Sequence, residues 1–340
     1  MNSPADRAVP RVVVSCVAEN SSEWFTKAYN LALSVREFGG RLAGTPIVVN
    51  FAGEVDREFS RRLSGDLDVT VHVIEPFEAS VAPTNKIRML DLFDEMSCDV
   101  LVALDCDILV TGDVGPWLPS SGIALRPEAR NPLTRHQWLT IFHDHGIAVP
   151  DADCKMISSG QSTYPYYNSG VVFVHRDSVG ELREMWPRYV RMFEDLCDRW
   201  PGTGAPPRRW WADQIALACF AASTSFPVQT FPVGLNFPTI FRVHSHYSDQ
   251  IHPPFLVHYH NQINGLGFVL ASRNRVVNPH IERFNLARAR ALQLPYDRLP
   301  RPPLMHTIRS AMAEHQWYES KAAKRVRGSA PLRLIRRIVR

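Results

Sequence analysis

Residues 100–110 are VLVALDCDILV, and this stretch decides the fold. The apolar run at its start predicts a strand that is buried on both faces, as in a parallel sheet. Asp105 and Asp107 follow where that strand should end. Mg²⁺ and Mn²⁺ prefer oxygen ligands, so two carboxylates one residue apart can address one cation. The alternative is that one aspartate caps the following turn and the other is solvated.

Strand and helix patterns alternate before this stretch. Expected strands cover residues 11–20, 45–53 and 69–76, and expected helices cover residues 21–40, 54–63 and 84–96. This alternation predicts right-handed βαβ units, and therefore an α/β fold with a mostly parallel central sheet and helices on both faces. Ligands bind outside the carboxyl ends of the strands in such sheets. Glu19 and Asn20 end the first expected strand, so we expect them beside Asp105 and Asp107.

The pattern becomes irregular over residues 129–166, which are polar and aromatic. A long irregular insertion in a regular domain is often a lid or a binding loop. Regular elements then resume. A strand is expected at 166–176, helices at 181–196 and 211–222, and late strands at 226–231 and 254–258.

Composition restricts the partners and the compartment. The chain has 340 residues, 45% of them hydrophobic, and a net charge of only +4, so it can bury a core and does not resemble a nucleic-acid binder. Its six cysteines lack paired metal spacing and are expected to be free thiols in a reducing compartment. No signal peptide or membrane-spanning stretch is evident, which favours the cytoplasm.

The C-terminal end is basic, with no acid after Glu319. Apolar residues such as Leu332 and Ile335 alternate there with arginines, which makes a basic amphipathic tail. Such a tail can lie peripherally on the anionic inner face of a membrane. The alternative is a solvated chain end.

An ordered set of motifs follows the Asp-x-Asp pair: Tyr167-Asn168-Ser169-Gly170, Trp211-Ala212-Asp213-Gln214, Leu235-Asn236-Phe237-Pro238 and Val257-His258-Tyr259-His260. With this set, residues 11–264 resemble the retaining glycogenin- and galactosyltransferase-like glycosyltransferases of the GT-A fold, often called family 8. The resemblance implies a Rossmann-like GT-A fold. It also implies hexose transfer from a nucleotide-diphosphate sugar, a UDP- or GDP-hexose, to a hydroxyl acceptor, with retention of configuration.

The resemblance also implies a domain organisation. Residues 1–282 would form the catalytic domain, with residues 129–166 as an acceptor or lid insertion. Residues 283–340 would form a helical extension that ends in the basic tail.

The same resemblance assigns a metal site for Mn²⁺ or Mg²⁺. Asp105 and Asp107 would hold the cation, with Asp105 also near the ribose of the donor. His258 matches the third ligand, and His260 is the fallback. Taken alone, His258 would more simply be a buried core histidine.

Donor-binding and catalytic roles follow from the matched motifs. Asn168, Ser169 and Gly170 would line the donor sugar pocket. Asp213 would grip sugar hydroxyls, and Gln214 would lie beneath the anomeric carbon. Outside the resemblance, Asn168 could simply cap a strand, and Asp213 could be an acid at the start of a helix.

The nucleotide would contact residues before the acidic pair. Ala18, Glu19 and Asn20 match the segment that contacts the base and ribose, and Lys86 matches a basic position near the diphosphate. Two departures stand out. The family usually has aspartate where this chain has Glu19 and Asn20, and residues 261–267, NQINGLG, lack the phosphate-clamping lysine that follows the late histidine. Phosphate binding would then use the metal, backbone N–H groups near residues 265–267, or Lys86.

Two other functions fit parts of the sequence, and a third does not. A haloacid-dehalogenase-like phosphatase also has Asp-x-Asp after an apolar strand, but normally near its N-terminus. A non-catalytic nucleotide-sugar or glycan-binding protein would keep the pocket without turnover. A sugar nucleotidylyltransferase would need a glycine-rich loop, and residues 13–20 contain no glycine.

Overall fold

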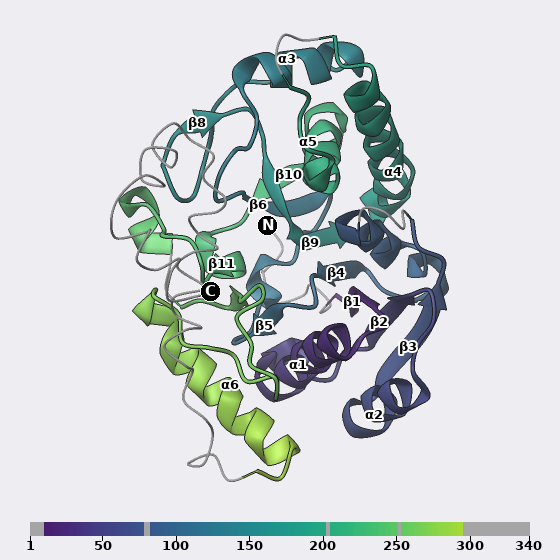
Figure 1. Cartoon of the computed structure of the whole chain (residues 1–340), viewed down its shortest axis with the longest axis vertical. Coiled ribbons are helices and arrows are strands. Elements are labelled where there is room, and N and C mark those ends of the chain that lie inside the picture. The colour runs from purple at the N-terminus through teal and green to yellow at the C-terminus, as the bar shows by residue number, and fades with distance from the viewer. Residues whose placement is uncertain (1–9, 78–81, 202–204, 251–252, 295–340) are drawn as a thin grey trace, which may run out of the picture.

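The computed structural model describes residues 10–77, 82–201, 205–250 and 253–294. Its centre is a seven-stranded sheet in the order β10-β6-β9-β4-β1-β2-β3 (Figure 1). The strands are β1 (Val12–Glu19), β2 (Ile47–Ala52), β3 (Val69–Ile74), β4 (Val100–Leu104), β6 (Ile123–Pro127), β9 (Tyr167–His175) and β10 (Val228–Thr230). Only β9 runs antiparallel to its neighbours β4 and β6 within this sheet. The expectation of a mostly parallel central sheet is confirmed.

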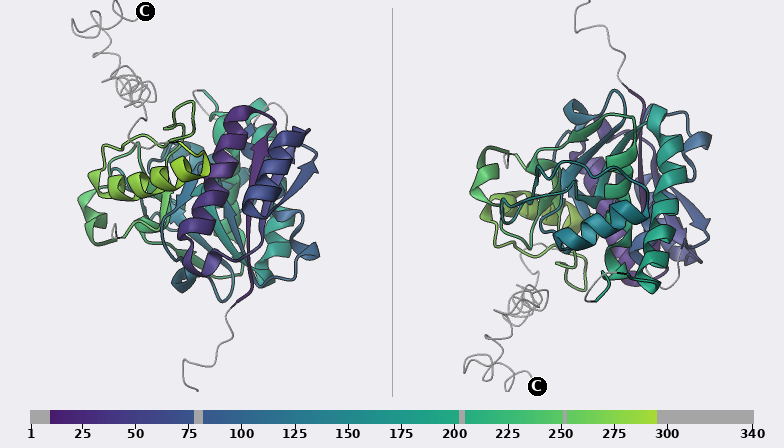
Figure 2. Two further views of the ribbon diagram at one scale, coloured as in Figure 1. Left: turned by 90° about the horizontal axis from the view of Figure 1, so that it is seen from below. Right: turned by 90° about the horizontal axis from the view of Figure 1, so that it is seen from above.

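Helices cover both faces of the sheet, as expected (Figures 1 and 2). One face carries α1 (Ser22–Phe38), α2 (Arg57–Leu67) and α6 (Asn278–Ala291), and the other carries α3 (Arg135–Asp144), α4 (Arg176–Asp198) and α5 (Ala212–Ser223). Alternate residues of β1 enter different apolar cores: Val14 and Cys16 join one cluster, and Val13 and Val17 join the other. A strand buried on both faces explains the continuous apolar run in its sequence.

A second sheet, in the order β11-β12-β5, lies beside the first. Its strands are β5 (Ile108–Val110), β11 (Phe237–Pro238) and β12 (Leu256–His258). Antiparallel pairing of β5 and β12 places His258 opposite Ile108, and the Tyr259 N–H donates to the carbonyl of Asp107 at 3.0 Å. This pairing brings the late histidine motif to the acidic pair.

Two expectations about secondary structure were wrong. The expected helix at 84–96 consists of 3₁₀ segments, η3 (Ala82–Leu90) and η4 (Phe93–Glu95). A 3₁₀ segment has three residues per turn, so Lys86 and Met89 share a face. The carbonyl of Met89 accepts from Ser15 Oγ at 3.2 Å, which joins η3 to β1.

The segment 129–166 is more regular than expected. It contains α3, which begins with a capping box between Thr134 and Gln137, and a short hairpin of β7 (Cys154–Lys155) and β8 (Ser162–Thr163). The other short 3₁₀ segments are η2 (Gly40–Leu42), η5 (Gly115–Trp117), η6 (Arg209–Trp211), η7 (Val233–Asn236), η8 (Ser245–Gln250) and η9 (Arg275–Val277).

The C-terminal prediction falls largely outside the described residues. Helix α6 runs across position 282/283, where the domain boundary was predicted, and it packs against α1. The predicted basic tail lies beyond residue 294, the last one described. Among the described residues, no helix is long and apolar enough to span a bilayer.

Candidate active site

The acidic pair occupies the turn between β4 and β5. Cys106 is buried, and its thiol donates to the carbonyl of Val17 at 2.9 Å. Because Cys106 turns into the core, the side chains on either side of it remain partly exposed, with 22% of Asp105 and 18% of Asp107 accessible. The contact with Val17 also places the end of β1 beside this turn.

His258 is oriented by a chain of amide groups. The N–H of Gly170 donates to Asn168 Oδ1 at 3.0 Å, and Asn236 Nδ2 donates to the same oxygen at 2.7 Å. Asn236 must therefore present Oδ1 to His258 Nδ1, 3.2 Å away. The other ring nitrogen, Nε2, lies 3.1 Å from Asp107 Oδ1. A hydrogen bond at Nδ1 that leaves Nε2 facing a carboxylate is typical of a metal-ligating histidine.

The residues around Asp107 fit a divalent cation. Ligand atoms of Asp107, His258 and His260 all lie within 4.8 Å of one another. The rings of the two histidines stack with centroids 3.9 Å apart, and His260 Nε2 is buried with no hydrogen-bond partner in the described part of the chain. An unpartnered buried nitrogen beside a carboxylate is the donor set that a cation satisfies.

The charge states of these groups favour metal binding. Burial alone would raise the pKa of Asp107, but the adjacent His258 lowers it below the ordinary value for an aspartate. Burial also lowers the pKa of His260, which keeps its imidazole neutral. A carboxylate and a neutral imidazole are the forms in which these side chains bind metals.

Asp105 belongs to a second group centred on Lys86. The Lys86 ammonium lies 2.9 Å from both oxygens of Asp105, 3.1 Å from Ser169 Oγ and 3.3 Å from Asp213 Oδ2. Ser169 Oγ donates to Asp213 Oδ2 at 2.6 Å. Burial alone would lower the pKa of Lys86, but Asp105 and Asp213 raise it above its ordinary value. Burial raises the pKa of Asp213, although Lys86 opposes this effect.

Gly170 joins the two groups. A Cβ at this position would lie 2.6 Å from Asp105 Oδ2 and 2.9 Å from His258 Cε1. Asp105 and His258 therefore border the same small space, which is open only because residue 170 has no side chain. The predicted ligands Asp105, Asp107 and His258 are thus brought together, with His260 beside them.

The start of α5 holds the predicted catalytic pair in place. Trp186 Nε1 donates to the carbonyl of Asp213 at 2.8 Å, and the hydroxyl of Tyr166 donates to Gln214 Oε1 at 2.6 Å. Both predicted residues are at least nine-tenths buried. The rigid placement of two polar side chains at one helix start suits a site that must position a substrate.

The predicted nucleotide-binding residues lie at the end of β1. Ala18 is buried, Glu19 is partly buried, and Asn20 is exposed with its Oδ1 accepting from the N–H of Asp56 at 3.2 Å. Within the described residues, no hydrogen bond connects these three to the Lys86 group. They remain candidates by position, beside the acidic turn.

A comparison with protein families decides the class of this site. Residues 14–224 match the model of the Rhodobacterales glycosyltransferase domain. The chain belongs to this glycosyltransferase family. The protein is therefore an enzyme, and the phosphatase alternative has no support. No curated protein is similar enough in sequence to be matched.

Solved structures agree on the fold of the glycosyltransferase. The galactosyltransferase LgtC in complex with donor and acceptor sugar analogues matches with a TM-score of 0.50 and 14% identity, over 82% of this chain and 95% of that one. An active-site mutant of LgtC matches with a TM-score of 0.52 and 15% identity, over 85% of this chain and 97% of that one. These likenesses confirm the GT-A fold.

The glycosyltransferase site contains polar residues that the sequence did not assign. Glu128 directly follows β6, and its carboxylate accepts from Asn168 Nδ2 and from the N–H of Ala129. An acid directly after a buried strand was a usable signal, equivalent to the one that found Asp105. Asn236 was quoted in a motif but given no role, because only the folded structure shows that it connects Asn168 to His258.

A buried lysine was also missed. Lys27 lies on α1, and its ammonium contacts Asn261 Oδ1 at 2.7 Å and Glu23 Oε1 at 2.8 Å. Asn261 opens the loop that lacks the expected phosphate-clamping lysine. No local pattern distinguishes Lys27 from any other helical lysine.

Proposed function

We propose that this glycosyltransferase moves a hexose from a UDP- or GDP-hexose to a hydroxyl acceptor, with retention and with a divalent cation, Mn²⁺ or Mg²⁺. The observation that carries the proposal is the convergence of Asp107, His258 and His260 beside the Lys86 group. One face of this arrangement offers metal ligands, and the other offers buried groups that can bind a sugar.

Asp107 and His258 would hold the cation, with His260 or Asp105 completing the protein ligands. When bound, the cation supplies positive charge that neutralises the departing nucleotide diphosphate. The amide chain from Gly170 through Asn168 and Asn236 keeps His258 Nε2 aimed at Asp107. Such orienting partners typically change metal affinity by about 10–100-fold.

The Lys86 group would receive the donor. The Lys86 ammonium already contacts Asp105, Ser169 and Asp213, so it would reach a phosphate or sugar oxygen by exchanging one of these contacts for the donor. Lys86 therefore orients the two carboxylates before the donor arrives. This supports its predicted place near the diphosphate, where the family's later lysine is missing.

Asp213 and Gln214 would act on the sugar itself. The buried Asp213 carboxylate accepts from Ser169 and can accept from sugar hydroxyls, and the Gln214 amide is held by Tyr166. A fixed carboxylate and amide oxygen stabilise positive charge that develops on the anomeric carbon in the transition state. Preorganisation matters here because these groups need not move during the reaction.

Nucleotide release tests this proposal directly. Wild type and Asp107→Asn would be incubated with UDP-, GDP-, ADP- and dTDP-sugars, with Mn²⁺ or with EDTA. We expect release from one donor that stops with EDTA and in the variant. The anomeric configuration of the product, read by NMR, tests retention. Full turnover by Asp107→Asn in Mn²⁺ would show that the metal assignment is wrong.

We also propose a cytoplasmic location. All six cysteines are free, and burial raises the pKa of Cys98 and Cys197 to about 11, as for inert thiols. Fractionation of cells would test this, and recovery of the protein from an extracytoplasmic fraction would contradict it. Binding of the full chain to anionic vesicles, with neutral vesicles as the control, would test the predicted membrane contact of the tail.

A further inference from the structure

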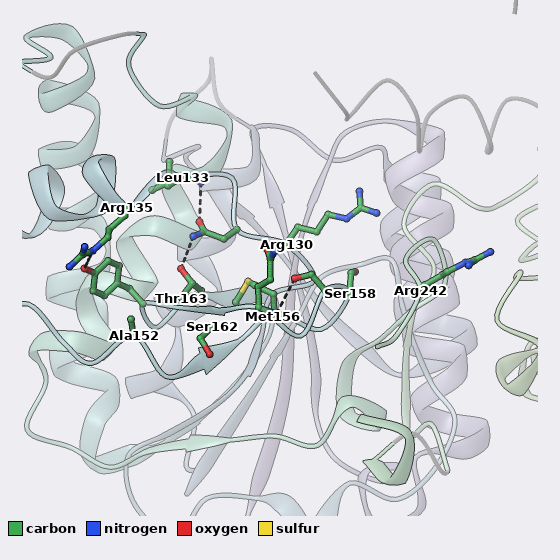
Figure 3. A pocket seen from close by; sticks show the side chains of 13 residues that line it. Arg130, Leu133, Arg135, Ala152, Met156, Ser158, Ser162, Thr163 and Arg242 are labelled. Atoms are coloured by element: carbon green, nitrogen blue, oxygen red, sulfur yellow. Dashed lines mark hydrogen bonds between the residues drawn. The ribbon is translucent and has the colours of Figure 1, made fainter. Parts of the chain in front are cut away.

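A cavity of about 720 Å³ opens in the segment that the sequence marked as an insertion (Figure 3). All of its lining residues except Arg242 come from residues 130–164. Its volume is within the range of small-molecule sites, which is about 300–1,000 Å³. None of the roles assigned above to the donor or the metal uses this cavity.

The lining is cationic and rich in hydrogen-bonding groups. Arg130, Arg135 and Arg242 line it, and no acidic residue does. The nearest acids in sequence, Asp151 and Asp153, are exposed and outside the lining. In Figure 3, Arg135 lies at one end of the lining and Arg242 at the other, with Arg130 between them. Hydroxyl and amide groups of Ser158, Ser159, Gln161, Ser162 and Thr163 complete the polar part.

Internal hydrogen bonds hold the cavity in shape. Asn131 Nδ2 donates to Thr163 Oγ1 at 2.6 Å, and Asn131 Oδ1 accepts from Trp138 Nε1 at 3.1 Å. The N–H of Ser158 donates to the carbonyl of Ala129 at 3.0 Å. The walls are therefore fixed to one another before any ligand binds, which lowers the entropic cost of binding.

Phe241 connects one residue of the cavity lining to the histidine pair of the candidate site. Arg130 stands two residues after Glu128, and its guanidinium lies 4.8 Å from the ring centre of Phe241. The Phe241 ring meets the His260 ring edge-on, with centroids 6.1 Å apart, and His260 stacks on His258. A molecule in the cavity would therefore lie close to the bound donor.

We propose that this cavity binds the acceptor, and that the acceptor is a sugar or glycan carrying an oxyanion, either phosphate or carboxylate. Guanidinium groups only donate hydrogen bonds, and their fork matches the oxygens of phosphate and carboxylate. The hydroxyl and amide groups of the lining suit sugar hydroxyls. This inference rests on the proposed transferase function, because it names the acceptor class for that reaction.

Binding without donor separates this inference from the proposed function. The full chain, in EDTA, would be titrated with glucose and galactose, their 6-phosphates, their uronic acids and inorganic phosphate. We expect a 6-phosphate or a uronic acid to bind about tenfold or more tightly than the neutral hexose. Comparison of the 6-phosphates with the uronic acids shows whether the cavity prefers phosphate or carboxylate. Equal affinity for charged and neutral sugars would overturn the inference, whether or not any donor is turned over.

Paired arginine variants locate the anion. Arg135→Gln/Arg242→Gln leaves Arg130 as the one arginine of the lining and should greatly reduce the preference for the charged sugar. Arg135→Lys/Arg242→Lys should lose less of it because the charge remains. Arg57→Gln/Arg275→Gln removes the same charge from exposed positions outside the lining and should change nothing. An undiminished preference in the first pair would overturn the inference, as would equal losses in the first and control pairs.

The transfer reaction gives a second readout. For an active donor, Arg135→Gln/Arg242→Gln should raise the KM for the charged acceptor about tenfold or more while leaving donor hydrolysis unchanged. An equal fall in donor hydrolysis would show that the arginines serve the donor, which would overturn the acceptor assignment. If the wild type turned over none of the donors, the proposed function would be contradicted. The binding titration would still decide the acceptor class.

Discussion

At the scale of single residues, Gly170 allows Asp105 and His258 to lie side by side. Its missing side chain leaves the space that Asp105 and His258 both border. The sequence identified this glycine through its motif. The sequence did not show why glycine is needed there, which is that Asp105 and His258, both distant in sequence, lie against this position of β9.

Gly170→Ala is expected to abolish transfer while the protein still folds. The new Cβ would meet Asp105 Oδ2 at 2.6 Å and His258 Cε1 at 2.9 Å, so both side chains must shift, and the proposed cation would lose its ligand geometry. Nucleotide release and Mn²⁺ titration would measure the effect, with a loss of at least about tenfold in metal affinity. Gly180→Ala is the control, because a Cβ there meets nothing within 4 Å. Unchanged Mn²⁺ affinity in Gly170→Ala would contradict this account of the site.

Lys86→Met is expected to destabilise the fold as well as stop transfer. The change leaves the Asp105 and Asp213 carboxylates near each other without the positive charge of the Lys86 ammonium between them. Removing one partner of a buried ion pair costs about 3–5 kcal/mol, and less here because Asp105 is partly accessible. Denaturant unfolding would measure the loss, which should be smaller at about pH 5 than at about pH 8, because protonation relieves the repulsion.

A second substitution tests that explanation. Lys86→Met/Asp213→Asn removes one of the carboxylates and should regain most of the lost stability without regaining transfer. If the double variant were no more stable than Lys86→Met, the cost would come from packing and not from charge. Such non-additivity is expected only between groups in contact.

At the scale of elements, the site depends on a pairing that crosses the chain. β5 and β12 are antiparallel neighbours, and η7 supplies the amide that links β12 to β9. The sequence predicted β12 from its apolar run but did not predict β5 as a strand separate from β4. It could not predict that Asn236 connects β12 to β9, because hydrogen bonds between distant side chains leave no periodic pattern.

Asn236→Ala is expected to weaken Mn²⁺ binding about 10–100-fold. His258 Nδ1 would lose its acceptor, and the ring would no longer be held with Nε2 toward Asp107. Asn285→Ala is the control, since the Asn285 amide also makes two hydrogen bonds, in its case to the N–H and carbonyl of Val269, but touches no proposed ligand. Calorimetric titration of both variants would show whether the effect is specific. Equal loss of affinity in both would point to general destabilisation.

The elements that sequence reasoning missed have identifiable causes. Helix α3 lies in a segment of mixed polar and aromatic residues, and its start depends on the capping box of Thr134 and Gln137, a local signal that the irregular composition obscured. Segment η3 has the composition of a helix. In the folded chain its Lys86 ammonium contacts Asp105 and the carbonyl of Met89 accepts from Ser15 on β1, which are contacts between distant segments that the local sequence does not show.

At the scale of the whole molecule, the βαβ units were predictable because each buried strand and each amphipathic helix carries its own pattern. The antiparallel placement of β9 between β4 and β6 was not, since strand order depends on contacts between distant segments. That placement carries Asn168, Ser169 and Gly170 into the centre of the site.

Metal binding should stabilise the entire glycosyltransferase. The proposed ligands connect distant segments, because Asp107 lies in the turn after β4, His258 at the end of β12 and His260 just after it. Mn²⁺ at one hundred times its dissociation constant contributes about 2.7 kcal/mol, which for a chain of this length raises the melting temperature by about 4 °C. Thermal unfolding with Mn²⁺, then with EDTA, would measure the gain and its reversal. Asp107→Asn should melt at one temperature in both conditions. If wild type also showed no difference, the cluster of Asp107, His258 and His260 would not be a metal site, and the Lys86 group alone would have to serve the donor.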